Sequence, residues 1–210
     1  MTNARYPQAR IWNRFAAGYA KRPVDDPEAY QIKLDKTAAL MRPDMKVLEF
    51  GCGTGTTALY HAEWVAQIDA LDFSSEMISI ARSKANTAGI GNVSFHLSTL
   101  EDWDIENGPY NLIMAHSVLH LVEDLGDTLR QTRRRLDEGG WFITSTVCIR
   151  DHSWLLSKLL PLASVTRLIP KVLPLSSDSL QRRIINAGFE ITEIWQPSAG
   201  KAVFIIARAT

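Results

Sequence analysis

Short apolar runs alternate with longer amphipathic segments along most of the chain from Lys46 onward. Apolar runs of this length are typical of strands that are buried on both faces of a sheet. Five of them are predicted to be strands: Val47–Phe50, Ile68–Asp72, Val93–Leu97, Asn111–Ala115 and Trp141–Val147. The amphipathic segments are predicted to be helices: Thr56–Trp64, Ser75–Ala88, Leu125–Leu136 and Ser177–Ala187. This alternation predicts an α/β fold with a doubly wound, mostly parallel, Rossmann-like sheet.

The C-terminus departs from this alternation. Ile191–Trp195 and Ala202–Arg208 are both strand-like, but the turn-rich stretch between them is too short for a crossover helix. The two runs are therefore predicted to form a C-terminal antiparallel hairpin.

The N-terminus has a different character, because Arg10–Ala20 and Pro27–Met41 have helical patterns before the first strand. We expect residues 1–45 to form a helical cap over the ligand-binding edge of the sheet. Residues 149–175 interrupt the pattern later in the chain and are interpreted as a lid-like insertion. All of these segments fit one domain over residues 1–210.

Composition narrows the classes of protein to consider. A chain of 210 residues with 46% hydrophobic residues can bury one sizeable core. Lys+Arg and Asp+Glu balance at 23 each, so no overall field favours a nucleic-acid partner. The two cysteines, Cys52 and Cys148, lack metal-ligand spacing, which favours a reduced, cytoplasmic protein without a metal site. The N-terminal residues lack the apolar region of a signal peptide, so no signal peptide is predicted. The chain also lacks an uninterrupted apolar stretch of roughly 20 residues, so no transmembrane segment is predicted.

The strongest chemical signal is a glycine-rich loop, Gly51-Cys52-Gly53-Thr54-Gly55, between the first predicted strand and the first predicted helix. Glycines at this point let a ligand approach the N–H groups of a helix N-terminus. The loop also fits a dinucleotide fingerprint with Asp72 about 20 residues further on, so an NAD-dependent oxidoreductase is one alternative. Glu49 argues against it, because its carboxylate would repel a pyrophosphate and stabilise a cationic ligand.

These residues resemble the first motif of class I S-adenosylmethionine-dependent methyltransferases, an acidic residue followed by G-x-G-x-G. The resemblance covers roughly Lys46–Thr146. Within this family, the chain resembles small-molecule methyltransferase domains of ubiquinone and menaquinone biosynthesis. The resemblance implies S-adenosylmethionine as cofactor and SN2 transfer of its methyl group to a small acceptor. The cofactor-binding residues that it implies in this first motif are Glu49, Gly51, Cys52, Gly53 and Gly55.

The resemblance continues at the end of the second predicted strand. It implies that Asp72 binds both ribose hydroxyls, because a carboxylate has two oxygens that accept hydrogen bonds side by side. Phe73 follows in the same motif and is included among the cofactor-binding residues. Met77 is expected against the adenine face, although an ordinary core position explains it equally well.

The third strand departs from the family pattern, since Thr99 stands where an adenine-binding aspartate is usual. Thr99 could accept one hydrogen bond from adenine, and Glu101 or Asp102 are alternatives for that contact. Leu100 is expected to offer its backbone N–H to the ring.

Two aromatic positions complete the predicted site. Tyr19, with Trp12 and Phe15 on one predicted helix, resembles the aromatic that many family members fold over the cofactor, although simple packing also explains the spacing. His116 ends the fourth strand, which in the family meets the methionine moiety. Its side chain is a candidate general base, or it packs beside the cofactor while its backbone makes the contact. No catalytic residue is assigned.

The acceptor is predicted only by class. The apolar segment 154–175 favours a small apolar or aromatic acceptor, and peripheral membrane contact or a dimer contact are alternatives for the same segment. Monomer and homodimer both remain open. Because of this segment and the missing adenine aspartate, a non-catalytic nucleoside-binding module is a second alternative to the enzyme.

Overall fold

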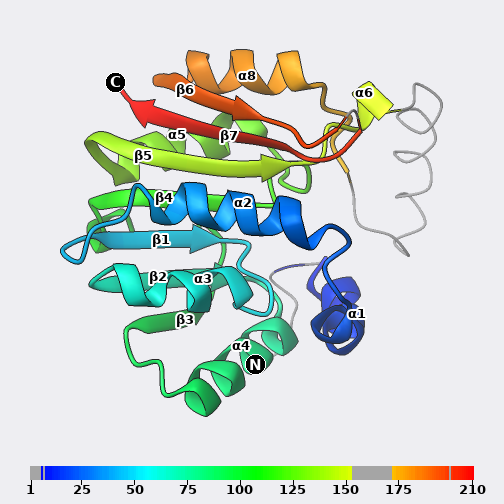
Figure 1. Ribbon diagram of the computed structural model, residues 1–210, viewed down its shortest axis with the longest axis vertical. Coiled ribbons are helices and arrows are strands. Elements are labelled where there is room, and N and C mark those ends of the chain that lie inside the picture. Colours follow the sequence, from blue (N-terminus) through cyan, green and yellow to red (C-terminus); the bar gives the residue numbers. More distant parts are fainter. Residues whose placement is uncertain (1–5, 7, 153–171, 199) are drawn as a thin grey trace. The chain divides into compact units, whose positions relative to one another are not determined.

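The computed structural model describes residues 6, 8–152, 172–198 and 200–210 (Figure 1). The chain divides into two compact units, Met1–Asp102 and Trp103–Thr210. Most of the predicted lid 149–175 and of the apolar segment 154–175 lies outside the described residues. The organisation of residues 1–210 as one domain stays a prediction.

The first unit contains three parallel strands in the order β3-β2-β1. Their register pairs Phe50 with Leu71 and Asp72 with Leu97, so the carboxyl ends of the three strands meet at one edge. The strands are β1 (Lys46–Phe50), β2 (Gln67–Asp72) and β3 (Val93–Leu97). The helices of this unit are α1 (Ala9–Lys21), α2 (Pro27–Ala38), α3 (Thr56–His61), the 3-10 turn η1 (Ala62–Trp64) and α4 (Ser75–Ala88).

Local capping explains where the helix that follows β2 begins and ends. The Ser74 hydroxyl accepts a hydrogen bond from the Met77 N–H at the start of α4, which satisfies one of the N–H groups without a helical partner. Gly89 ends the same helix with a φ of 66°, in the left-handed conformation that glycine adopts at helix C-termini. Ser74 thus fixes the start of α4 directly after the end of β2, and Gly89 fixes its end.

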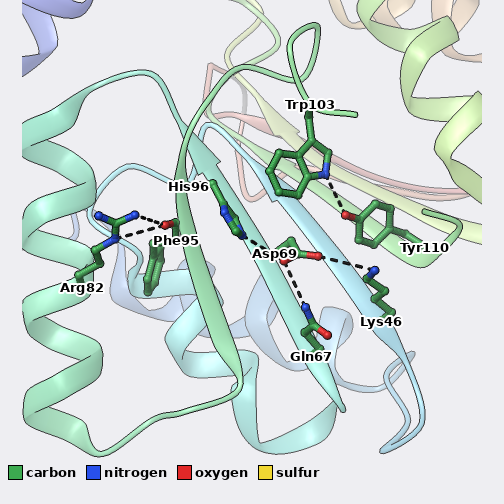
Figure 2. A network of polar contacts seen from close by, with 8 residues as sticks. All are labelled: Lys46, Gln67, Asp69, Arg82, Phe95, His96, Trp103 and Tyr110. Atoms are coloured by element: carbon green, nitrogen blue, oxygen red, sulfur yellow. Dashed lines mark hydrogen bonds and ion pairs between the residues drawn. The ribbon is translucent and has the colours of Figure 1, made fainter. Parts of the chain in front are cut away.

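A buried carboxylate in the middle of β2 connects the three strands of the first unit (Figure 2). Asp69 Oδ1 lies 3.1 Å from His96 Nε2 of β3 and accepts a 3.3 Å hydrogen bond from Gln67 Nε2. Lys46 Nζ of β1 lies 4.0 Å from Asp69 Oδ2. A buried carboxylate is costly unless such partners surround it, so we assign this network a structural role in holding the strands together.

The second unit contains four strands in the order β4-β5-β7-β6. β4 and β5 are parallel, whereas β7 is antiparallel to both β5 and β6. The strands are β4 (Tyr110–His116), β5 (Leu136–Thr146), β6 (Phe189–Trp195) and β7 (Val203–Ala209). The helical segments are η2 (Ile105–Asn107), α5 (Leu125–Arg135), α6 (Ile149–His152) and α8 (Ser177–Asn186).

The predicted fold class is confirmed: the protein is an α/β, Rossmann-like structure with mostly parallel strands and a C-terminal antiparallel hairpin formed by β6 and β7. The predicted start of the fifth strand at Trp141 is wrong, because β5 begins at Leu136, which pairs with Tyr110. The first residues of β5 include Asp137, Glu138 and two glycines, so they lack the apolar signal of a buried strand. In the part of the chain that the structure describes, no helix combines the length and apolar character required to cross a membrane.

Candidate functional site

The glycine-rich loop leaves β1 and enters α3, as predicted. All three of its glycines have positive φ: 68° at Gly51, 53° at Gly53 and 76° at Gly55. At Gly55 the requirement is also steric, because an added Cβ would lie 2.7 Å from the Phe95 ring and 2.9 Å from the Ala81 Cβ. The loop therefore needs glycine at this position both for its backbone conformation and for its contact with α4 and β3.

Glu49, the fourth residue of β1, lies directly before this loop and is only 2% exposed. Burial raises the pKa of its carboxyl to about 8; the Ala58 N–H opposes this shift and the negative charge of Asp72 adds to it. Its Oε2 has no hydrogen-bond partner within the described structure. A buried polar oxygen of this kind is costly when left unpaired, and a cationic group is the partner that satisfies a carboxylate best. The ammonium and sulfonium charges of S-adenosylmethionine fit this requirement.

Asp72 ends β2 and is held by two backbone N–H groups. Gly53 N–H donates to its Oδ2 at 2.9 Å, and Ser74 N–H donates to its Oδ1 at 2.8 Å. Burial raises the pKa of Asp72, and these two hydrogen bonds work in the opposite direction. Each carboxylate oxygen can accept a further hydrogen bond, so a fixed carboxylate with room for two hydroxyl donors is what a ribose diol requires.

Cys52 lies inside the loop, but its side chain is buried. Its N–H donates to the Leu71 carbonyl at 2.9 Å, which continues the pairing of β1 with β2 into the loop. Burial, together with the negative charges of Asp72 and Glu49, raises the pKa of the thiol. Cys52 therefore holds a protonated thiol, and its carbonyl accepts the Gly55 N–H at 3.0 Å, so both of its backbone groups shape the loop.

Tyr19 of α1 lies against the loop. Its Cε1 is 3.9 Å from the position that a Cβ of Gly53 would take, and 51% of the residue is exposed. Partial burial and the negative charges of Glu49 and Asp72 raise its pKa. The aromatic ring predicted to cover the cofactor is thus next to the glycine loop and to both carboxylates.

The position of α1 depends on a residue that the sequence analysis missed. Asn13 Oδ1 accepts a 2.6 Å hydrogen bond from the Ser74 hydroxyl, and Asn13 Nδ2 donates to the Ser75 hydroxyl at 3.3 Å. These contacts attach α1 to the N-terminus of α4, next to Asp72. No motif identifies Asn13, because its partners are distant in the sequence.

Tyr30 of α2 was also missed as a site residue. Its hydroxyl lies 3.3 Å from Thr57 Oγ1, one residue before Ala58, the backbone partner of Glu49. Burial raises the pKa of Tyr30; its hydrogen bond with Thr57 opposes the shift, and the negative charge of Glu49 adds to it. Because α2 is only weakly amphipathic, no pattern in the sequence distinguishes Tyr30 as a site residue.

Polar and aromatic groups also meet beyond the ends of β2 and β3. Thr99 Oγ1 accepts a 3.3 Å hydrogen bond from the Asp102 N–H, and the Tyr6 hydroxyl donates to Asp102 Oδ2. The Tyr6 ring lies 6.1 Å from the Phe73 ring between centroids. Leu100 is buried. Cofactor binding by Phe73 and the adenine contacts expected of Thr99 and Leu100 stay predictions, with Glu101 and Asp102 as alternatives to Thr99.

Met77 belongs to the first unit, and His116 and His120 belong to the second. Met77 is buried in α4 at 2% exposure, as expected of a core position, and its adenine contact stays a prediction. In the second unit, the His116 ring stacks on Phe204 at 6.4 Å with an interplanar angle of 5°. Burial lowers the pKa of His120 to about 4, so this imidazole is neutral near pH 7. A general-base role of His116 stays a prediction.

Among the described residues, no cluster of three or more His, Cys, Asp or Glu side chains could hold a metal ion. The first unit does bring together the predicted donor-side residues: Tyr19, Glu49, the glycine loop and Asp72.

Sequence comparison finds relatives among methyltransferases. The chain is 29% identical over 116 residues to the uncharacterized methyltransferase YcgJ of Bacillus subtilis, covering 55% of this chain and 46% of that relative. It is 28% identical over 156 residues to magnesium-protoporphyrin O-methyltransferase of Rhodobacter capsulatus, covering 74% of this chain and 67% of the relative. The chain thus spans less than half the length of the first relative.

Structural comparison finds the same fold. The crystal structure of YcgJ matches with a TM-score of 0.71 at 17% identity, covering 85% of this chain and 98% of that one. Geranyl diphosphate methyltransferase in complex with SAM matches with a TM-score of 0.71 at 16% identity, covering 86% and 84%.

The family model described as a methyltransferase domain matches residues 24–194, which is most of the chain. The match includes β1, the glycine loop and the strand end that carries Asp72. With the sequence relatives and the fold, it establishes that the chain belongs to the S-adenosylmethionine-dependent methyltransferases.

Proposed function

We propose that this protein transfers a methyl group from S-adenosylmethionine to a small apolar or aromatic acceptor. The main support for S-adenosylmethionine as the donor is Oε2 of Glu49, which is buried beside the glycine loop without a hydrogen-bond partner. In its ionised form this carboxyl would repel a pyrophosphate and stabilise the positive charge of the methyl donor. Asp72, oriented by two backbone N–H groups, adds a partner for the ribose hydroxyls.

Bound S-adenosylmethionine supplies a methyl group on a sulfonium centre, which needs little covalent help from the protein. The residues of this chain bind and orient the donor and exclude water from it. Glu49 balances positive charge, Asp72 fixes the ribose end, and Tyr19 covers the loop next to both carboxylates.

The acceptor class is inferred from the surface next to the donor site. Phe15 and Tyr19 lie one turn apart on α1 and are 46% and 51% exposed. Tyr19 provides aromatic surface beside the glycine loop, and Phe15 lies one turn away on the same helix, which favours an acceptor with an apolar or aromatic part. Two of the matched proteins are named for magnesium-protoporphyrin and for geranyl diphosphate, and both compounds have a large apolar part.

We expect the protein to act in the cytoplasm on a free small molecule, without a nucleic-acid partner. Both cysteines, Cys52 and Cys148, are free and buried, which agrees with a reducing compartment. The balance of 23 basic and 23 acidic residues gives no overall attraction to polyanions.

The test is a transfer assay with S-adenosylmethionine that carries a labelled methyl group. Purified protein is incubated with separate pools of phenols and quinols, isoprenoid compounds, aliphatic amines, and nucleic acid. Label is expected in the aromatic or isoprenoid pools and not with Asp72→Ala protein. Label that enters only the amine pool or the nucleic acid would contradict the proposed acceptor class and leave the donor assignment intact.

A further inference from the structure

Lys84 of α4 donates two hydrogen bonds to the glycine loop. Its Nζ lies 3.0 Å from Oγ1 of Thr54 and 3.0 Å from Oγ1 of Thr56. Thr54 is buried, and Thr56 is the first residue of α3. Because these threonines flank Gly55, the ammonium group bridges the point at which the loop becomes a helix.

The same part of α4 is also attached to β3. Arg82 Nε and Nη2 donate to the Phe95 carbonyl at 3.2 and 2.6 Å (Figure 2). The Phe95 ring and Ala81 are the groups that fill the space beside Gly55. Arg82 therefore holds α4 to β3, while Lys84 holds α4 to the loop.

Lys84 does not have the surroundings of a freely solvated lysine. Burial lowers its pKa, which means that the ammonium group has lost part of its hydration. A long side chain fixed at two hydroxyls also loses rotamer freedom. The two hydrogen bonds from a charged donor offset these costs, which favours a specific role for this contact over incidental surface packing.

The loop that Lys84 holds is the one that positions the donor-side groups. Gly53, one residue before Thr54, donates its N–H to Asp72. A displacement of Thr54 would therefore move the Gly53 N–H and release one of the two hydrogen bonds that orient Asp72.

We propose that Lys84 is a positioning residue for S-adenosylmethionine. It acts through Thr54 and Thr56, which it holds so that the loop has its binding conformation before the cofactor arrives. The proposal rests on the family assignment and is independent of the acceptor class.

The first experiment compares Lys84→Met, which keeps a long side chain without donors, with Lys84→Arg and with Lys201→Met as a matched exposed control. Isothermal titration with S-adenosylhomocysteine is expected to show a Kd raised about tenfold in Lys84→Met, because the variant lacks the two hydrogen bonds that the charged ammonium group donates to the threonines. Lys84→Arg should recover most of the affinity, and Lys201→Met should equal the wild type. Methyl transfer should show a raised KM for the cofactor with kcat unchanged.

A second readout needs no cofactor. Amide hydrogen exchange of the ligand-free protein should become faster at Thr54–Thr56 in Lys84→Met, while the strand amides of β6 and β7 keep their rates. A Kd within twofold of the wild type together with unchanged exchange of the loop would overturn the proposal.

A double-mutant cycle tests whether Lys84 acts through the threonines. The Thr54→Val/Lys84→Met protein should bind the cofactor about as weakly as Lys84→Met alone, because both changes break the same contact. Independent, additive losses would overturn the proposed route. If Lys84→Met does not fold, Thr56→Val replaces it in the test. This variant removes one of the two hydrogen bonds and should raise the Kd about threefold. An unchanged Kd would overturn the proposal.

Discussion

The backbone N–H of Gly53 donates a 2.9 Å hydrogen bond to Oδ2 of Asp72, which joins the glycine loop to the end of β2. The opposite carboxylate oxygen accepts the Ser74 N–H at 2.8 Å. The carboxylate is thus fixed by two neighbouring backbone segments rather than by flexible side chains. A group held in this way loses little freedom when a ligand binds, so more of its interaction energy contributes to affinity.

Replacing Gly55 by alanine is expected to destabilise the fold. The new Cβ would meet Phe95 at 2.7 Å and Ala81 at 2.9 Å in a residue with φ of 76°. Backbone strain and overpacking together should lower the free energy of unfolding by about 2 to 5 kcal/mol, measured by urea denaturation. Gly89→Ala is the control, because its φ is 66° but nothing lies within 4 Å of its Cβ. Equal losses in the two variants would show that crowding at Gly55 is unimportant.

Cofactor affinity is expected to depend on pH through Glu49. Burial raises its pKa to about 8, so near pH 7 most of the ligand-free protein holds a neutral carboxyl at this position. A cationic ligand binds the ionised form, so affinity should rise with pH up to about 8, by at most about tenfold per pH unit, and then level off. Titrations of Glu49→Gln should lack this rise. The same pH dependence in both proteins would exclude Glu49 as its source.

The same group affects the stability of the ligand-free protein. Because the folded pKa of about 8 lies above the ordinary glutamate value of 4.5, the folded state binds this proton more tightly between those two pH values. The contribution of Glu49 to stability is therefore present at low pH and is lost as pH rises toward 8. Thermal melts should accordingly show that Glu49→Gln loses less stability than the wild type between pH 6 and pH 9; a larger loss in the variant would argue against a buried neutral carboxyl.

Removal of the Tyr19 ring should weaken cofactor binding without unfolding the protein. Tyr19→Ala is expected to raise the Kd about fivefold, which corresponds to the loss of roughly 1 kcal/mol of aromatic contact, whereas Tyr19→Phe should bind nearly as the wild type does. Phe15→Ala is the matched control, one turn earlier on α1 and 46% exposed. If Phe15→Ala weakens cofactor binding as much as Tyr19→Ala, the aromatic surface of α1 acts as a whole and Tyr19 has no special position.

The placement of the donor-side candidates at one edge of the sheet was predictable from the sequence, because their signals are local. Glu49, the glycines and Asp72 occupy strand ends, and in a parallel sheet the carboxyl ends of neighbouring strands share one edge. The pairing of Phe50 with Leu71 confirms this arrangement. The hairpin of β6 and β7 was predictable for a similar reason, since a short linker between two strand-like runs leaves few alternatives.

The residues that support the site could not be predicted in this way. Asn13 contacts Ser74 across 61 positions, Lys84 contacts Thr54 across 30, and Tyr30 contacts Thr57 across 27. Each is a polar residue on a helix surface, where the pattern gives no reason to prefer a long-range partner over water. The early start of β5 was missed because Leu136–Gly140 is mostly polar or glycine.

We propose that the glycine loop, Glu49 and Asp72 together bind S-adenosylmethionine. The most direct test is calorimetric titration of the purified protein with S-adenosylmethionine and S-adenosylhomocysteine, alongside Asp72→Ala and the surface control Glu190→Gln. We expect saturable binding of one cofactor per chain, a Kd raised about 10- to 100-fold in Asp72→Ala through loss of hydrogen bonds to a charged acceptor, and no change in Glu190→Gln. No binding by the wild type, or the same Kd in Asp72→Ala, would contradict this proposal.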